Sequence, residues 1–333
     1  MGRRPEAAVS PERAQGAGRA GGAPAGAGAA AAAAGAATAP AGTPQLYAAL
    51  LDDAALFPPG EAPMDEAVAG HLRYRVGPQA PLTGPFVVAA GRLAELGRVL
   101  RGHPGSPLAV CVTVPEGPGG LGPALEEAAA LPLVEPVAVE VAAGAAGGGA
   151  DGGEAAAEVA RAAAALDRHL PRNAAGFVEL PRGADPGRCL DALAGTAHRA
   201  KLRTGGTRAD AFPGEDELAG ALCAAAERGR ALKCTAGLHH AVRYTDPRTG
   251  FEHHGFLNVL LAVHTALRGG DRADAAEVLA LRDGARAAAA AAGLGAEEAA
   301  AVRALFSSFG TCSVLEPLGD LVALGLLSPA VLE

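Results

Sequence analysis

The sequence predicts an α/β fold of the (β/α)8 class, a TIM barrel in which a closed parallel sheet is surrounded by helices. From residue 44 onward, short runs of β-branched residues and Leu alternate with longer amphipathic stretches, the pattern of parallel βα units. Eight such pairs follow one another within about 290 residues, an ordinary length for a closed barrel. An open doubly wound sheet is the competing fold, but no GxGxxG sequence follows the first expected strand to indicate it.

The expected strands are short apolar segments such as PFVVAA, LAVCVTV and PVAVEVA. They are, in order, residues 54–59, 85–90, 108–114, 136–142, 176–181, 199–204, 231–236 and 305–315. Each is followed by a segment whose apolar residues recur with the spacing of a helix. The expected helices are residues 64–75, 92–100, 123–131, 154–170, 187–195, 215–229, 255–269 and 318–327. In such a barrel the carboxyl ends of all strands lie at one face, which carries the chemistry.

The remaining segments are expected outside the regular βα units. Residues 1–43 are rich in Ala, Gly and Pro and lack the Leu, Val and Phe of a signal-peptide core. We therefore expect a disordered Ala/Gly-rich tail there and a single barrel domain over residues 44–333. The Gly-rich stretch 144–153 is expected to be a flexible insert, and 271–300 to add helix between the seventh and eighth units.

Composition excludes several classes of partner. The net charge of −8 argues against nucleic acid and against an anionic membrane surface, so we expect a small-molecule substrate, and assembly with further copies of the chain is left open. The five cysteines are odd in number and lack CxxC spacing, which favours reduced thiols in a cytoplasmic protein over disulfides or a zinc site. Nothing in the sequence indicates a cofactor, and none is expected.

Only two of the 28 basic residues are lysines, Lys201 and Lys233, and both fall near the ends of expected strands six and seven. Arginine stays charged at physiological pH, whereas a lysine amine can become a neutral nucleophile. Burial and a second nearby cation both favour that form. With Lys233 and Arg203 as cationic neighbours, we expect a lowered pKa for Lys201. The alternative is a pair of lysines that bind a phosphate or carboxylate group.

Two carboxylates lie inside apolar strands, Glu140 in VAVEVA and Glu179 in GFVELP. A carboxylate in such a place is costly unless it is paired, so both should face the barrel mouth and meet cations there. An ion pair with Lys201 or Arg203 and a role in proton transfer are equally compatible with this pattern. Asn258, near the start of the seventh helix, is expected to cap that helix rather than to touch substrate.

Four histidines follow the seventh strand within 16 residues: His239, His240, His253 and His254. One interpretation is a metal site, since imidazole is a common metal ligand. Adjacent histidines on a strand point to opposite sides, however, so a His-His pair rarely supplies two ligands to one ion. The favoured interpretation is that His239 and His240 bind substrate or transfer protons.

Three short motifs follow one another on the last three strands: KLRTG at 201–205, KCTAG at 233–237 and FGTCS at 309–313. Together they resemble the deoxyribose-phosphate aldolase family of class I aldolases. That family carries KTSTG with a Schiff-base lysine on strand six, a second lysine on strand seven, a phosphate loop on strand eight and an acidic residue on strand four. Glu140 is at about the place of that acid. The resemblance departs at Gly237-Leu-His-His, where the family has GG-[IV]-R, and at strand one, where an Asp-His pair is replaced by Asp52 and Asp53.

The resemblance implies a lysine-dependent, Schiff-base carbon–carbon lyase acting on a small carbonyl compound. Lys201 would attack the carbonyl, Lys233 would lower its pKa, and Glu140 with His239 or His240 would move protons. The residues expected to bind substrate are Arg203, Glu179, Gly310, Thr311, Ser313 and Asp53. Two alternatives remain: a metal-assisted hydrolase or isomerase built on the four histidines, and an inactive barrel that binds an anion.

Overall fold

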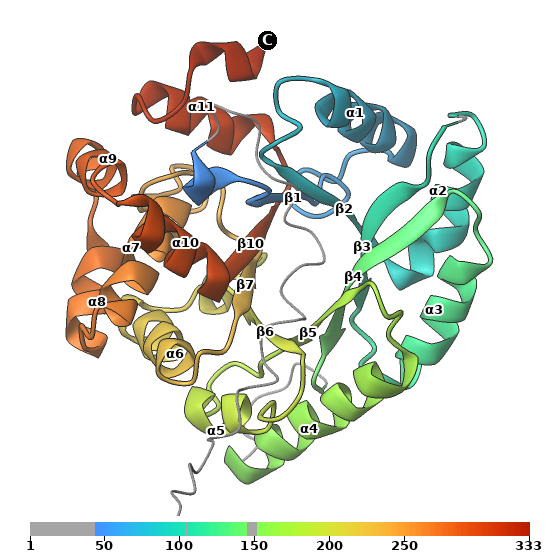
Figure 1. Ribbon diagram of the computed structural model, residues 1–333, viewed down its shortest axis with the longest axis horizontal. Helices are drawn as coiled ribbons and strands as arrows, with labels where there is room; N and C mark the ends of the chain where they lie inside the picture. Colours follow the sequence, from blue (N-terminus) through green and yellow to red (C-terminus); the bar gives the residue numbers. More distant parts are fainter. Residues whose placement is uncertain (1–43, 104, 145–151) are drawn as a thin grey trace, which may run out of the picture. The chain divides into compact units, whose positions relative to one another are not determined.

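The structure, a computed structural model, describes residues 44–103, 105–144 and 152–333 and contains a closed barrel of eight parallel strands ringed by helices (Figure 1). The fold predicted from the sequence is confirmed. Around the barrel the order is β1-β10-β7-β6-β5-β4-β3-β2, so each strand pairs with its neighbours in the chain's succession of βα units. The expected tail, residues 1–43, lies outside the described residues, as do 145–151 of the expected insert.

The barrel strands agree with the expected ones to within a few residues, except for the first. They are β1 (Leu51–Asp53), β2 (Thr83–Ala89), β3 (Leu108–Val114), β4 (Val134–Ala142), β5 (Ala175–Glu179), β6 (Arg199–Arg203), β7 (Leu232–Thr235) and β10 (Phe306–Thr311). The first strand was expected at 54–59, and this is wrong. Residues from Ala54 onward form a loop, and Pro58 and Pro59 have no N–H groups for a sheet ladder.

Helices cover the outside of the sheet on all sides (Figure 1). They are α1 (Met64–Val76), α2 (Leu93–Leu100), α3 (Leu121–Ala129), α4 (Gly152–His169), α5 (Pro186–Asp191), α6 (Glu215–Glu227), α7 (Phe256–Leu267), α8 (Arg272–Ala280), α9 (Gly284–Ala292), α10 (Ala296–Leu305) and α11 (Leu315–Ala323). The extra helix expected over 271–300 is confirmed as α8, α9 and the first half of α10. Asp271 and Asp283 start α8 and α9 by accepting backbone N–H groups of the first turn. No helix in the described part of the chain is long and apolar enough to cross a membrane.

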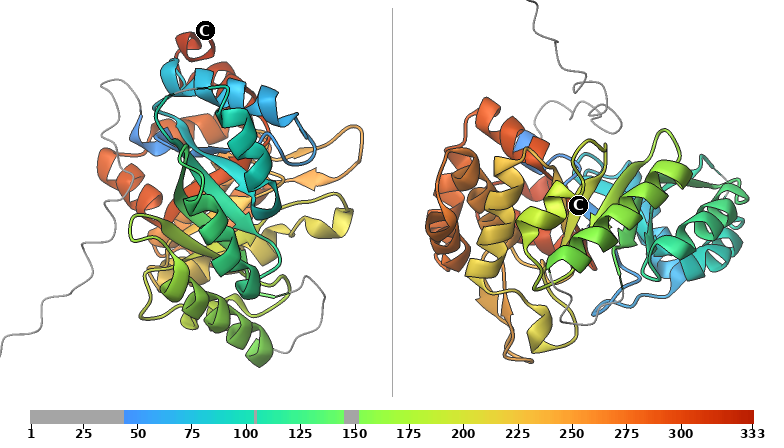
Figure 2. Two further views of the ribbon diagram at one scale, coloured as in Figure 1. Left: turned by 90° about the vertical axis from the view of Figure 1, so that its right-hand side faces the viewer. Right: turned by 90° about the horizontal axis from the view of Figure 1, so that it is seen from below.

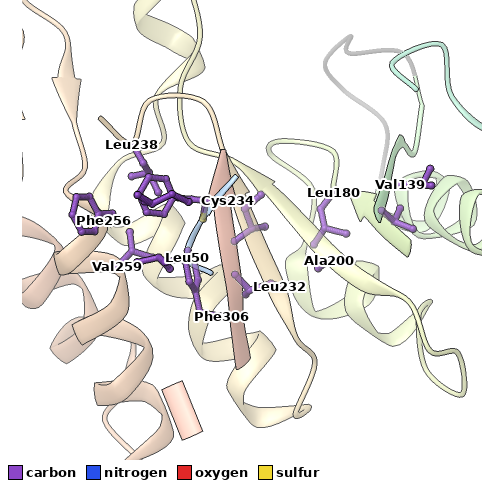
Figure 3. Close-up of a cluster of buried hydrophobic side chains, with 14 of the residues drawn as sticks. Leu50, Val139, Leu180, Ala200, Leu232, Cys234, Leu238, Phe256, Val259 and Phe306 are labelled. Atoms are coloured by element: carbon purple, nitrogen blue, oxygen red, sulfur yellow. The ribbon is translucent and has the colours of Figure 1, made fainter. Parts of the chain in front are cut away.

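The main hydrophobic core lies between the sheet and the helices, and this fixes which side chains face the barrel interior. Ala200 and Leu202 of β6 and Leu232 and Cys234 of β7 belong to this outer core. Figure 3 shows part of it, with Phe256 and Val259 of α7 beside side chains from the strands. Because successive residues of a strand point to opposite faces, the residue between each of these pairs faces inward.

The interior of the barrel is filled by a second, smaller apolar cluster of Val87, Cys111, Ala138 and Phe177. These four side chains come from β2, β3, β4 and β5. The opposite part of the interior, against β6, β7, β10 and β1, holds charged side chains instead. The barrel interior thus contains both an apolar cluster and an ionic cluster, and Glu140 of β4 belongs to the latter.

Two long segments leave the barrel where strands β6 and β7 end. The first, residues 204–214, precedes α6. The second, residues 236–255, contains the antiparallel hairpin β8 (Tyr244–Thr245) and β9 (Glu252–His253). Both project from the same side of the barrel (Figure 2, left). This hairpin was not expected from the sequence pattern.

Candidate functional site

The candidate site is a cavity of about 1070 Å³ that opens at the carboxyl ends of the barrel strands. Its wall is built from the strand ends and from the loops that follow them, including 204–214 and the hairpin. Eight residues predicted for the site line it. They are Glu140, Glu179, Lys201, Arg203, His239, His240, Gly310 and Ser313. Asp53, Thr311 and Lys233 do not contribute to the wall.

Lys201 is buried, with 5% of its surface exposed, and its amine is held by two carboxylates. Nζ lies 2.7 Å from Glu140 Oε2 and 2.8 Å from Glu179 Oε2. Register explains the second contact, because Glu179 of β5 is directly paired with Lys201 of β6. Adjacent strands lie about 5 Å apart, so inward-facing side chains of paired residues can contact one another.

Lys233 is paired with Lys201 in the β6–β7 register but lies deeper, with 1% of its surface exposed. Its Nζ contacts Asp52 of β1 and lies 2.6 Å from Glu140 Oε1. The ring of Phe177 is centred 5.2 Å from the same nitrogen. Glu140 therefore bridges the two ammonium groups, one through each carboxylate oxygen.

Two neutral donors complete the buried cluster. The Cys111 thiol donates to Glu140 Oε1 at 3.2 Å, and the Ser308 hydroxyl donates to Asp52 Oδ2 at 2.9 Å. Each buried carboxylate thus has a cation and a neutral hydrogen-bond donor, which offsets the cost of removing it from water.

The expected lowering of the Lys201 pKa is wrong for the free protein. Burial favours the neutral amine, but the negative charges of Glu140 and Glu179 outweigh it and raise the pKa of Lys201. In Lys233, burial is likewise outweighed by Asp52 and Glu140, and the pKa lies well above its ordinary value. The ion pairs that were considered for Glu140 and Glu179 are present, and their negative charges outweigh the effect of the cations on which the expected lowering rested.

The carboxylates are ionised for the complementary reason. Burial would raise the pKa of Glu140, but Lys201 and Lys233 lower it strongly. The pKa of Glu179 is also lowered, since Lys201 and Arg203 outweigh the effect of burial. Arg203 Nε lies 2.8 Å from Glu179 Oε1, so the predicted substrate-binding pair forms an ion pair in the free protein.

His239 and His253 both line the cavity and lie next to one another, with ring centroids 5.9 Å apart. Burial lowers the pKa of His239 to about 4, with smaller contributions from His253 and His240, so this imidazole is neutral at neutral pH. Its Nδ1 lies 3.5 Å from Cys312 Sγ. His253 Nδ1 lies 3.1 Å from the carbonyl oxygen of Gly237, and burial lowers its pKa as well.

The other two histidines are engaged elsewhere, so the four imidazoles do not converge on one point. His240 Nδ1 lies 3.1 Å from Asp320 Oδ2 on α11. His254 is fully buried, with Nε2 2.8 Å from the Pro213 carbonyl and Nδ1 3.3 Å from Arg243 Nη1. Over residues 44–103, 105–144 and 152–333, no group of three or more His, Cys, Asp or Glu side chains is arranged to hold a metal ion. The alternative metal site on this loop is not supported by the geometry.

Three further expectations are corrected. Asp53 was expected near the substrate but does not line the cavity, since its Oδ2 lies 3.0 Å from His71 Nδ1 on α1 and its Oδ1 accepts the Ala55 N–H. Thr311 is buried, and its hydroxyl donates to the Ser313 carbonyl at 2.9 Å. Asn258 does not cap α7. Its side chain instead accepts the Arg243 N–H and donates to two carbonyl groups at the end of α8.

Asp52 is the charged residue that the predicted site lacked. In a three-residue strand, nothing in the sequence decides which of two adjacent aspartates points inward. The outer core supplies the answer, because Leu51 packs outside and Asp53 reaches α1. The aromatic wall of the cavity was also missed, because Phe212, Tyr244 and Phe251 lie in polar, loop-like segments.

The two glycines that close the KLRTG and KCTAG motifs have a packing role. A Cβ atom on Gly205 would lie 2.7 Å from Gly237 Cα, so the loops after β6 and β7 touch through bare backbone. Gly237 has a φ of +80°, a conformation that favours glycine. These glycines keep the two lysine-bearing strand ends side by side.

The fold and the site together define a TIM-barrel protein with a buried lysine–carboxylate cluster at its carboxyl-terminal mouth. All five cysteines, which lie within the described residues, are free thiols. The sequence matches no model of a known protein family and no curated protein sequence.

Proposed function

We propose that this protein is a Schiff-base enzyme, a carbon–carbon lyase of the class I aldolase kind that acts on a carbonyl compound through Lys201. The observation that carries the proposal is the position of the Lys201 amine. It lines a cavity of about 1070 Å³ and contacts two carboxylates at 2.7 and 2.8 Å. Amine, proton acceptors and space for a substrate therefore occur together.

A raised pKa is compatible with this role because the amine and the carboxylates titrate as a unit. The pKa of Glu179 is low mainly because the Lys201 charge opposes the effect of its burial. When Lys201 passes a proton to Glu179, the positive charge that stabilised the carboxylate disappears. The pKa of the Glu179 carboxyl group therefore rises, which favours the transferred state. Glu179 lines the cavity, whereas Glu140 is shared with Lys233.

The neutral Lys201 amine then attacks the carbonyl carbon, and the carbonyl oxygen takes the proton from Glu179. Loss of water from this carbinolamine leaves a cationic imine. In the lyase direction the β-hydroxyl group loses its proton to a base, the Cα–Cβ bond breaks, and its electron pair moves toward the imine to form an enamine as the β-carbon leaves in an aldehyde. Protonation of the enamine at Cα and hydrolysis of the resulting imine release the second product and restore the Lys201 amine. His239 is suited to take the proton of the β-hydroxyl group, because it lines the cavity and its low pKa keeps it neutral.

Lys233 is a positioning residue in this scheme. Its amine contacts Asp52 and Glu140 and does not line the cavity. Its ammonium group contacts one oxygen of Glu140, so the negative charge of that carboxylate is shared between the two lysines. This sharing limits the rise in the pKa of Lys201.

The test is reductive trapping. The full chain is incubated with sodium cyanoborohydride and a panel of aldehydes and ketones, digested at arginine, and mapped by mass spectrometry. We expect an adduct on the peptide that contains Lys201. Because the chain has only two lysines, the N-terminal amine is the one further site of reaction, and its peptide is quantified separately.

Two variants control this experiment. Lys201→Arg keeps the charge but removes the nucleophile and should lower trapping about a hundredfold or more. Lys233→Arg keeps Lys201 and should still be trapped. An adduct on Lys233 would reverse the assigned roles, and the absence of an adduct on either lysine across the panel would favour an inactive anion-binding barrel.

A further inference from the structure

Away from Lys201, the cavity wall is unusually aromatic for this chain. The sequence contains eight phenylalanines, three tyrosines and no tryptophan. Four of these aromatic side chains line the cavity that contains Lys201: Phe57, Phe212, Tyr244 and Phe251. Such a concentration in a chain with few aromatic residues indicates that the wall contacts a flat ligand group.

Three of these rings, Phe212, Tyr244 and Phe251, form with His253 a chain of ring contacts that joins the two projecting segments. Phe212, from the segment before α6, lies 5.6 Å from the Phe251 ring and 4.4 Å from the His253 ring, measured between centroids, and is tilted against both. Tyr244 stacks on His253 at 4.8 Å. Both segments project from the same side of the barrel (Figure 2). The ring positions are therefore fixed by contacts between the loops before any ligand binds.

The wall offers no excess of positive charge for a phosphate group. Its cations are Lys201, Arg203, Arg208 and Arg248. Its carboxylates are Glu140, Glu179, Asp246 and Glu316. Arg203 contacts Glu179, and Arg208 makes two contacts with Asp210 at 2.9 and 3.1 Å. With His239 neutral, positive and negative side chains are balanced.

A carboxylate lies three residues beyond the segment 309–313, for which the resemblance implies a phosphate loop. Glu316 lies in the first turn of α11 and lines the cavity, with its oxygens 3.6 Å from His239 Nδ1 and 3.7 Å from His240 Nε2. The Ser313 hydroxyl accepts the Glu316 N–H, and Asp320 accepts the Ala241 N–H at 2.7 Å. Two backbone donors near this position, the Glu316 and Ala241 N–H groups, are thus already engaged, and the Glu316 carboxylate would repel an anion.

We infer that the substrate is an unphosphorylated carbonyl compound whose body is a flat aromatic ring stacked against Phe212, Tyr244 and Phe251. The carbonyl part of this inference rests on the proposed function, whereas the aromatic part rests on the wall alone. The cavity, at about 1070 Å³, is slightly larger than the range of about 300–1,000 Å³ that is usual for small-molecule sites, and it leaves room for such a ring beyond Lys201.

The first test compares trapping rates at Lys201 for three aldehydes: 3-phenylpropanal, 3-cyclohexylpropanal and glyceraldehyde 3-phosphate. Each rate is divided by the rate with N-α-acetyllysine, which removes intrinsic reactivity. We expect the phenyl compound to exceed the phosphate at least about tenfold and the cyclohexyl compound about threefold, since ring stacking adds to simple burial. Equal or faster trapping of the phosphate, or no preference for phenyl over cyclohexyl, would overturn the inference.

Matched variants locate the preference. Phe212→Leu should reduce the phenyl preference to about the cyclohexyl level, whereas Val76→Ala, at an exposed apolar residue of α1, should leave it unchanged. Glu316→Gln should raise trapping of the phosphate several-fold by removing a negative charge, and Glu277→Gln, at an exposed residue of α8 outside the wall, should not.

A second measurement separates this inference from the proposed function. The unreactive alcohols 3-phenylpropan-1-ol and glycerol 3-phosphate are titrated into the protein by calorimetry, with Phe212→Leu as the control. Tighter binding of the phenyl alcohol that weakens in Phe212→Leu supports the aromatic site even if no aldehyde is trapped, in which case only the Schiff-base function fails. Tighter binding of glycerol 3-phosphate overturns the inference.

Discussion

Lys201 and Lys233 occupy paired positions on neighbouring strands, yet the structure gives them different surroundings. Both are buried, both contact Glu140, and carboxylates raise the pKa of each. The difference is access, because Lys201 lines the cavity and Lys233 lies beneath it. The comparison teaches that charge alone does not separate the two lysines. What separates them is that only the Lys201 amine lines the cavity, and the proposed function rests on this difference.

The largest expected difference between the two lysines is in stability. Lys233→Met leaves Asp52 and Glu140 buried with too little positive charge and should lower the free energy of unfolding by about 3–5 kcal/mol. Lys201→Met should cost about half as much, because water in the cavity can solvate Glu179. Urea unfolding of both variants provides the measurement. Equal losses would mean that the cavity does not distinguish the two positions.

His239, one of the histidines that line the cavity, should behave in the opposite way to the lysines, because burial and neighbouring imidazoles lower its pKa. The pKa of His239 is about 4 in the folded protein against about 6.5 in an unfolded chain. The unfolded state therefore binds more protons between these values, so stability falls as the pH drops from about 6.5 toward 4. We expect His239→Gln to reduce this loss by about 2 kcal/mol. Thermal or urea unfolding at a series of pH values would show parallel curves if His239 were not responsible.

The smallest expected effect concerns the aspartate that faces away. Asp53→Asn weakens the contacts with His71 and the Ala55 N–H and should cost about 1–2 kcal/mol, while trapping at Lys201 stays unchanged. Asp52→Asn, at the adjacent residue, removes the negative charge that pairs with the Lys233 ammonium group. It should therefore lower the free energy of unfolding more than Asp53→Asn does. A fall in trapping for Asp53→Asn would show that this residue reaches the site after all.

The sequence predicted the barrel and most of its ionic cluster because both depend on local patterns. Lys201, Lys233 and Glu140 each lie between apolar neighbours, so strand alternation turns all three side chains inward. The strand ends then bring residues separated by 61 and 181 positions into contact.

Other parts of the site depend on tertiary contacts that no local pattern reveals. Adjacent Asp52 and Asp53 could not be told apart in a three-residue strand. The hairpin of β8 and β9 has strands of only two residues each. The ring of His253 in this hairpin contacts Phe212, which lies in a different loop. The direction of the lysine pKa shift required the distances to Glu140 and Glu179, which strand order alone does not supply.

The most direct test of Lys201 as the reactive amine is NMR of protein labelled with 15N at lysine Nζ, because the chain supplies only two such signals. Lys201→Arg and Lys233→Arg assign them. On addition of 3-phenylpropanal, we expect the Lys201 signal to move from the ammonium to the imine region while the Lys233 signal remains an ammonium. Movement of the Lys233 signal, or of neither signal at saturating carbonyl concentration across the panel, would contradict the assignment of Lys201 as the nucleophile.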